Sequence, residues 1–418
     1  MSRIRHLLSP LRNPALRRVF AAKAASGFGD WAGRLALAVL VYERSSSATW
    51  AAAVTIVSLL PWLGPGQLLA TFADRFGRIR VMVGSDLARA ALFAMMLLPL
   101  PIHVLLVLAF AAGTCSVAFA GARAATLFEV SDPDDYPAAL SLNAMLHQAE
   151  ILVGYALGGV IIAAVGAPAA LGVNAATFAF SALLIATVSS SAASERREDA
   201  ALGVEGVRRG LRIWRDDPMC GRALLLFAGV AAFMVLPEAL VVPAADEIGV
   251  PPAMVGLLTA FIAIGAIIGI ALAPSGGEHA DLLRRTAVRG MIASVIAAGL
   301  FATGAVPAFL VLAFVVSGMA DAVSIPTNQV VGERLPATGR AAAMAVAVGV
   351  ANGTQVVSIA IAGLAADRFG TLVPLAVGMT AAAGVCLYAV VRPVADDRRV
   401  TGTADTPAPT PAALAEAA

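Results

Sequence analysis

The chain has 418 residues, of which 59% are hydrophobic and only 13% are charged, and its mean hydropathy is +0.85. A soluble domain is roughly half apolar and about a quarter charged, so this composition excludes an ordinary soluble enzyme, a disordered scaffold and a nucleic-acid-binding protein. The net charge is only +2, which makes the placement of the charges more informative than their sum.

Cysteine and lysine usage excludes several kinds of site. Cys115, Cys220 and Cys386 lie far apart in apolar stretches, so neither a disulfide framework nor a zinc site is expected. Lys23 is the single lysine, which excludes a phosphate-binding loop with its Gly-Lys-Ser/Thr motif. We therefore expect no metal and no cofactor, and any pumping must draw on an ion gradient or on a partner.

Twelve apolar stretches are long enough to cross a bilayer, which needs about 20 residues. They lie near 19–42, 49–72, 81–99, 102–128, 138–164, 168–188, 219–242, 252–273, 286–304, 307–331, 341–365 and 371–391. Very short connections at 100–101, 165–167 and 305–306 predict antiparallel neighbours. The sequence thus predicts an all-α membrane protein with twelve transmembrane helices.

Basic residues gather in alternate connections between these stretches. Most of them fall within 3–23, 75–80, 196–222, 284–289, 334–340 and 392–399. The opposite connections hold only Arg44 and Arg368. Basic loops stay in the cytoplasm, so we predict a multi-pass protein of the plasma (inner) membrane with both termini cytoplasmic.

A polar interruption divides the chain into two halves. Residues 189–218 are first polar, then basic and amphipathic, and predict a cytoplasmic linker whose later part lies along the membrane surface. The linker separates six spans in residues 1–188 from six spans in residues 219–392. Residues 393–418 are polar and rich in Pro, Thr and Ala, and are expected to form a disordered cytoplasmic tail.

The two halves are related by an internal repeat. The pentapeptide LVLAF occurs at 106–110 and again at 310–314, an offset of 204 residues. The same offset pairs Asp74 with Glu278, Arg80 with Arg284, Glu129 with Glu333, Gly159 with Gly363 and Gly166 with Gly370. Parallel repeats of this kind are typical of secondary transporters whose site lies between the repeats near mid-membrane. We predict two pseudo-symmetric six-helix bundles.

The loop between the second and third spans reads ATFADRFGRIR. Its core, Asp74-Arg75-x-Gly77-Arg78, resembles the signature loop of the major facilitator superfamily, with alanine in place of the leading glycine and the last basic residue shifted to Arg80. The resemblance implies the major facilitator fold. It extends over residues of about 15–392, and the branch that the chain most resembles is that of enterobactin and macrolide exporters.

The charges of this loop suit a conformational latch. Asp74 can cap a helix, while Arg75 and Arg78 can hold the ends of neighbouring helices, and such pairs break at little cost when water enters. The alternative is that the arginines only set topology. The residues assigned to the latch are Asp74, Arg75, Gly77, Arg78, Asp86 and Arg89.

Two further segments resemble exporters of this family. Residues 154–159, Gly-Tyr-Ala-Leu-Gly-Gly, are a loose form of the glycine-rich stretch of its proton-coupled exporters, without their proline. Arg123 is similar to the buried arginine that such exporters carry in the fourth span. These similarities imply export coupled to protons.

Ionisable side chains within spans cost roughly 2.5–3.5 kcal/mol each and are functional candidates. Asp30 and Arg34 lie about 6 Å apart along one helix face, within reach of a salt bridge. Glu238 follows Arg34 at the repeat offset, and the family resemblance places Asp30, Arg34 and Glu238 around one pocket. The residues assigned to proton coupling and the substrate cavity are Asp30, Arg34, Arg123, Glu150 and Glu238.

We hypothesise that Asp30 or Glu238 carries the proton, because burial raises the pKa of a carboxyl group and a nearby arginine lowers it. A static ion pair between Asp30 and Arg34 is the alternative. Glu150 with His147 could equally be a structural pair.

We expect a secondary active transporter that exports an amphipathic small molecule, such as a drug or a siderophore, in exchange for protons. We expect the protein to lie in the lipid bilayer as a monomer. We expect no nucleic acid among its partners. A proton-coupled importer or a uniporter of a metabolite remains open. So do a channel and a membrane-embedded enzyme or lipid-handling protein, although four scattered histidines give an enzyme little support.

Overall fold

The computed structural model describes residues 8–63, 76–132, 135–188, 204–274, 276–304, 306–335 and 340–392. Within these ranges the chain forms helices and no strand. Eight of the described helices are long and apolar enough to cross a membrane. An all-helical membrane protein is thus confirmed, whereas twelve spans in two six-helix bundles remain a prediction.

The helices follow the predicted spans closely. In chain order they are η1 (Ser9–Arg12), α2 (Pro14–Ser45), α3 (Ala48–Leu59), η2 (Leu60–Leu63), α5 (Arg78–Met95), α6 (Ile102–Val130), α7 (Tyr136–Ala186), α8 (Val204–Asp216), α9 (Pro218–Met234), α10 (Leu236–Ala239), α11 (Val241–Glu247), α12 (Pro252–Ala271), α13 (His279–Thr303), α14 (Pro307–Asp321), α15 (Ser324–Arg334), α16 (Arg340–Phe369) and α17 (Leu372–Val391).

Four predicted spans differ in detail from the helices. The spans at 138–164 and 168–188 are joined in α7, which is broken at Gly166, where φ is +83°. The span at 219–242 is divided into α9, α10 and α11, and the span at 307–331 into α14 and α15. A positive φ suits glycine, so the sharp turn between the two parts of α7 falls where the sequence predicts a connection.

Side-chain caps fix where several helices begin. The Asn13 side chain accepts a hydrogen bond from the Ala15 amide at the start of α2. The Asp217 carboxylate accepts bonds from the amides of Met219 and Cys220 at the start of α9. Such caps satisfy amides that have no partner within the helix, and each stabilises a helix by about 1 kcal/mol.

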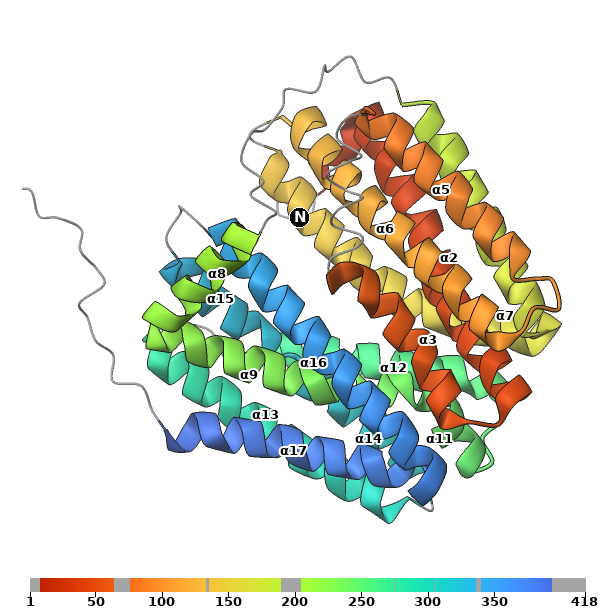
Figure 1. Cartoon of the computed structure of the whole chain (residues 1–418). Coiled ribbons are helices and arrows are strands. Elements are labelled where there is room, and N and C mark those ends of the chain that lie inside the picture. The colour runs from red at the N-terminus through yellow and green to blue at the C-terminus, as the bar shows by residue number, and fades with distance from the viewer. Residues whose placement is uncertain are drawn as a thin grey trace, which may run out of the picture.

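The two halves of the chain occupy opposite sides of the molecule. Figure 1 shows the helices of residues 8–188, coloured red to yellow, beside those of residues 204–392, coloured green to blue. One end of the molecule carries residues 8–13, 131–132 and 204–217, and we call it the linker end. The opposite end, with the turns at 46–47, 166 and 370–371, is the turn end.

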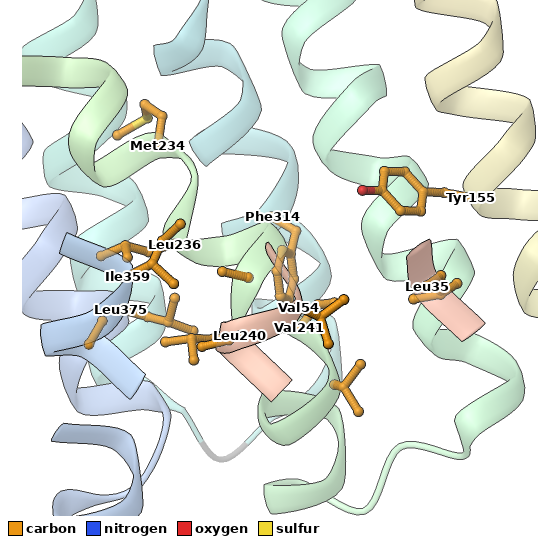
Figure 2. Packing of buried hydrophobic residues seen from close by; sticks show 14 of the residues in the cluster. Leu35, Val54, Tyr155, Met234, Leu236, Leu240, Val241, Phe314, Ile359 and Leu375 are labelled. Carbon is orange, nitrogen blue, oxygen red and sulfur yellow. The ribbon is translucent and has the colours of Figure 1, made fainter. Parts of the chain in front are cut away.

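Close backbone contacts join the halves toward the turn end. α7 packs against α12, and α3 packs against α16. A Cβ atom on Gly256 of α12 would lie 2.4 Å from the Tyr155 carbonyl oxygen, and one on Gly363 of α16 would lie 3.1 Å from the Thr49 Cα atom. Buried apolar residues of α3 and α11 also meet here, as Figure 2 shows for Val54 and Val241.

The amphipathic helix α8 packs on the second half of the chain. Trp214 is only 5% exposed, and its indole nitrogen donates a 2.8 Å hydrogen bond to the Ala343 carbonyl of α16. Trp214 and Ile213 pack into the core while Leu211 is 50% exposed, and a position of α8 along the membrane surface stays a prediction.

Candidate functional site

One carboxylate links three helices between the two halves. Glu238 of α10 accepts a 3.3 Å hydrogen bond from the Arg34 guanidinium of α2. The same oxygen accepts a 2.5 Å hydrogen bond from the Tyr155 hydroxyl of α7. Arg34 and Tyr155 belong to the first half and Glu238 to the second, so this cluster, which we call the midline cluster, connects the halves directly.

Local structure explains how Glu238 reaches the first half. It sits where the helical course between α9 and α11 is interrupted, directly after Pro237. Proline lacks an amide donor and breaks the regular helix. On the opposite side, the Arg34 guanidinium lies 4.3 Å from the centre of the Trp31 ring, and that ring lies 5.3 Å from the Tyr155 ring. This stacking orients the guanidinium toward Glu238.

Two further carboxylates lie within electrostatic range of the midline cluster. Asp30 interacts through its charge with Arg34, and Asp321, at the end of α14, does so with Glu238. Neither carboxylate has a hydrogen bond or an ion pair within the described ranges. The expected Asp30–Arg34 salt bridge is not formed, because Arg34 turns toward Glu238 and Trp31 instead.

A second charged cluster lies entirely within the first half. The Lys23 ammonium group is 2.7 Å from both carboxylate oxygens of Glu150, and both side chains are less than one tenth exposed. His147 lies 3.6 Å from Glu150, and Arg123 donates a hydrogen bond to Asn143 and interacts with Glu150 through its charge. Three positively chargeable groups, Lys23, His147 and Arg123, thus act on one carboxylate.

The structure places Arg123, which the sequence assigns to the substrate cavity, beside the Lys23–Glu150 pair. Sequence reasoning did not foresee the Lys23–Glu150 pair. The available signal was a single lysine and a glutamate, each in a predicted span, because opposite charges in apolar helices tend to pair. Only the fold brings positions 127 residues apart together.

Glycines allow the helices that carry these residues to approach closely. A Cβ atom on Gly154 of α7 would lie 3.0 Å from the Phe28 carbonyl oxygen, and one on Gly158 would lie 2.9 Å from the Ala32 Cα atom. The glycine-rich stretch therefore brings α7 against α2. A side chain at either position would force Tyr155 away from Glu238.

The predicted latch is described only in part. Asp74 and Arg75 lie outside the described residues. Gly77 has φ of +78°, which favours glycine at this turn. Arg78 forms an ion pair with Glu129 and donates a hydrogen bond to the Ala125 carbonyl. These contacts join α5 to α6 within the first half.

Asp86 and Arg89 occupy a different place from the rest of the latch. They form an ion pair with each other about 12 Å along α5 from its first residue. Both are almost fully buried, and the Arg89 guanidinium lies 4.8 Å and 4.2 Å from the ring centres of Phe119 and Phe178. We therefore separate this pair from the latch, because it is enclosed in the first half.

Hydrogen bonds at the turn end connect the halves a second time. The Tyr42 hydroxyl donates a 2.9 Å bond to Asp246. Asp367 of α16 accepts bonds from the Ser47 hydroxyl at 2.8 Å, the Ala48 amide at 2.6 Å and the Thr49 amide at 3.2 Å. The carboxylate of one half thereby caps a helix of the other half.

Both the midline cluster and the turn end follow the sequence repeat. Arg34 and Glu238 are 204 residues apart, and so are Tyr42 and Asp246. Corresponding positions of the two halves thus face each other at two levels, two helical turns apart. In the described ranges no group of three His, Cys, Asp or Glu residues is arranged to hold a metal ion.

Comparisons with known proteins all point to the same family. The profile of the Major Facilitator Superfamily matches residues 19–282, which is more than half of the chain. An uncharacterised transporter of this type, YfiS of Bacillus subtilis, is 22% identical over 262 residues, which are 62% of this chain and 63% of YfiS.

The multidrug efflux pump Tap of Mycobacterium tuberculosis is 31% identical over 217 residues, covering 49% of this chain and 51% of Tap. The chain thus spans between half and two thirds of the length of these relatives. Among solved structures, a peptide transporter, POT, in complex with sulfate is 15% identical with a TM-score of 0.68, covering 90% of this chain and 93% of POT. That likeness concerns the fold.

Proposed function

The chain belongs to the major facilitator superfamily, whose members are transporters and not enzymes, and from this premise we propose that it exports an amphipathic small molecule in exchange for protons by alternating access. The efflux activity named for Tap, which shares 31% identity over part of its length, supports export over import. The observation that carries the coupling is the midline cluster, where Glu238 joins the two halves.

The proposed architecture is twelve spans in two six-helix bundles, residues 1–188 and 219–392, with residues 189–218 as the linker and 393–418 as a tail. We place the linker end in the cytoplasm and the protein, as a monomer, in the plasma membrane. The support is the gathering of arginines on the linker side of the predicted spans. The turn end then faces outward.

The proton acts through the contacts that Glu238 makes. As a carboxylate it attracts Arg34 and accepts the Tyr155 hydroxyl hydrogen bond, and both contacts cross from one half to the other. Protonation removes the charge that holds Arg34, which weakens the connection between the halves. Whether a proton is bound therefore biases which end is open, as a coupled exchange requires.

The substrate site is proposed next to the same cluster. Asp30 and Asp321 have no hydrogen bond or ion pair within the described ranges and are at least partly accessible. Trp31, which contacts Arg34 and Tyr155 of the midline cluster, provides an aromatic surface. A carboxylate beside an aromatic ring suits an amphipathic molecule with a cationic group.

The test is transport of a labelled panel of amphipathic compounds by cells that make the protein, with and without a protonophore. We expect efflux that stops when the protonophore collapses the proton gradient. Glu238→Gln should abolish gradient-driven efflux, whereas Glu333→Gln, which removes an exposed carboxylate at the linker end, should leave it near the parental rate. Gradient-driven efflux by Glu238→Gln at the parental rate would refute the assignment.

The same experiment separates the other modes of transport. Net accumulation of a compound that the protonophore prevents would show a proton-coupled importer. Movement in both directions that ignores the protonophore would show a uniporter. Asp30→Asn and Asp321→Asn, measured with cationic and neutral compounds, test the substrate site, because loss of transport for the cationic compounds alone is expected.

A further inference from the structure

A pocket of about 220 Å³ lies at the linker end of the second half, far from the midline cluster. It is an open pocket lined by the first turns of α9, the first turns of α13 and the last turn of α17. Its floor is apolar, with Met219, Leu226 and Leu283, all buried. Two arginines, Arg222 of α9 and Arg284 of α13, complete the lining.

The two arginines have no hydrogen bond or ion pair within the described ranges. Their neighbours differ in this respect. Arg285 bonds to Asp281 at 3.1 Å and to the Gly276 carbonyl at 2.6 Å, and Arg334 bonds to Asp217 at 2.9 Å. A guanidinium carries five donors, so the lining of this pocket holds many unused donors.

The corresponding place in the first half is built differently. At the repeat offset of 204, Arg222 corresponds to Arg18 and Arg284 to Arg80. Arg18 donates a 2.8 Å hydrogen bond to the Thr187 carbonyl after the end of α7. Of the two corresponding pairs, one therefore differs: Arg18 is bonded to its own half's backbone, whereas Arg222 keeps its donors available to a ligand.

The formal charges of the residues that line the pocket sum to one positive charge when the paired Asp281 is left out. Besides the two arginines, Glu278 and Asp281 line it, and Asp281 is paired with Arg285 outside the lining. Two guanidinium charges against the Glu278 carboxylate therefore leave a single excess cation. A group with one negative charge and several acceptor oxygens would match it, and arginine binds phosphate oxygens with paired donors.

The surroundings favour a lipid as the source of that group. The pocket lies within two turns of three helix ends, which is the depth of the lipid headgroups if the helices cross the bilayer. Beside it, on the same helices, the apolar side chains of Leu225, Leu387 and Val391 are 47%, 49% and 66% exposed. Hydrocarbon chains would cover these side chains while a headgroup enters the pocket.

We propose that this pocket binds the phosphodiester of an anionic phospholipid, with Arg222 and Arg284 donating to its phosphate oxygens and acyl chains lying along Leu225 and Leu387. Basic pockets between transmembrane helices on the cytoplasmic side are suited to anionic headgroups. The site is independent of the substrate cavity, and it would anchor α9 to α13 and α17 at the linker end.

The test uses the full chain in nanodiscs that contain phosphatidylglycerol diluted in phosphatidylcholine, with bound lipid measured by native mass spectrometry. We expect wild-type protein to retain phosphatidylglycerol in preference to phosphatidylcholine. Arg222→Gln with Arg284→Gln should weaken retention roughly thirtyfold, from the loss of two arginine contacts. The control, Arg80→Gln with Arg208→Gln, removes the same total charge from exposed positions and should change retention less than about twofold.

Other outcomes decide against the proposal. Equal retention of phosphatidylglycerol and phosphatidylcholine, or unchanged retention in the Arg222/Arg284 variant, would overturn it. Displacement of the lipid by millimolar inorganic phosphate would show a site for a free anion and would overturn the lipid assignment. If the double glutamine variant does not fold, Arg222→Lys with Arg284→Lys keeps the charge but loses the paired donors, and an intermediate loss is then expected.

Discussion

The two ends of the molecule use polar contacts in different ways. At the turn end, Asp367 and the Tyr42–Asp246 hydrogen bond connect one half of the chain to the other. At the linker end, the described ion pairs stay within one half, namely Arg78–Glu129 in the first and Arg334–Asp217 and His279–Glu333 in the second. The turn end is therefore where the halves are closed, and the linker-end pairs keep each half in one piece.

This difference predicts which substitutions shift the balance between open states and which only weaken the fold. Each hydrogen bond contributes about 1 kcal/mol, so the few bonds of the turn end can change a population several-fold without unfolding the chain. The predictions below are ordered from the largest expected effect to the smallest.

Gly256→Ala should prevent closure of the turn end. The added Cβ atom would lie 2.4 Å from the Tyr155 carbonyl oxygen, and backbone cannot move aside as a flexible side chain can. We expect an increased distance between spin labels on Trp50→Cys and Leu364→Cys, and loss of transport. Gly299→Ala is the control, because a Cβ atom there meets nothing within 4 Å. An unchanged distance in Gly256→Ala would contradict the view of the turn end as the closed end.

Asp367→Asn should also weaken closure of the turn end, but less than Gly256→Ala does. The substitution leaves one acceptor oxygen but puts an NH2 donor where the other carboxylate oxygen accepts, and a hydrogen bond to a charged group contributes about 1.5–3 kcal/mol. The fraction of molecules with an open turn end should rise about tenfold. The same pair of spin labels measures it, and Asp246→Asn, which replaces the charged acceptor of a single bond from Tyr42 by a neutral amide oxygen, should give a smaller rise.

Arg78→Gln should lower the stability of the fold without separating the two halves at the turn end. It removes the ion pair with Glu129 and the bond to the Ala125 carbonyl, both inside the first half. For a partly exposed pair the loss is about 1 kcal/mol or less. Thermal unfolding in detergent should show a slightly lower midpoint, while the spin-label distance stays that of the parent. A shifted distance would mean that linker-end pairs also control opening.

The Asp217–Arg334 pair should make the stability of the fold slightly dependent on pH in the acid range. Burial raises the pKa of Asp217, but hydrogen bonds from Arg334 and the amides of Cys220 and Met219 outweigh it, so the pKa lies below its ordinary value of 3.8. A lowered pKa stabilises the fold above pH 3.8, and this contribution is lost as the pH falls through the lowered value. Thermal midpoints of the parent and Asp217→Asn should differ near neutral pH and converge in acid.

Much of the helical course could be predicted because apolar stretches of bilayer length have few alternative structures. The turn at Gly166 and the divided span around Glu238 fall where Gly and Pro interrupt the pattern. The proximity of Arg34 and Glu238 was expected from the repeat together with the family resemblance.

Contacts that break the repeat could not be predicted. Lys23 with Glu150 and Asp367 with the start of α3 join positions that no offset relates, and only helix packing brings them together. The sequence does not reveal that Tyr155 donates to Glu238, because the glycines beside it indicate only close helix packing. Charge alone could not place Asp86 and Arg89, since their depth along α5 and their burial are properties of the folded chain.

The face-to-face placement of Arg34 and Glu238 has a consequence for how such a molecule arises by gene duplication. Two identical copies would set the same side chain against itself on the symmetry axis, and two like charges there would repel. Positions on the axis must therefore become different early, whereas positions away from it are free to stay alike. Tyr42 and Asp246, the corresponding positions two helical turns toward the turn end, likewise carry different side chains. Sequence divergence between the repeats is thus a requirement of symmetry and not merely its gradual erosion.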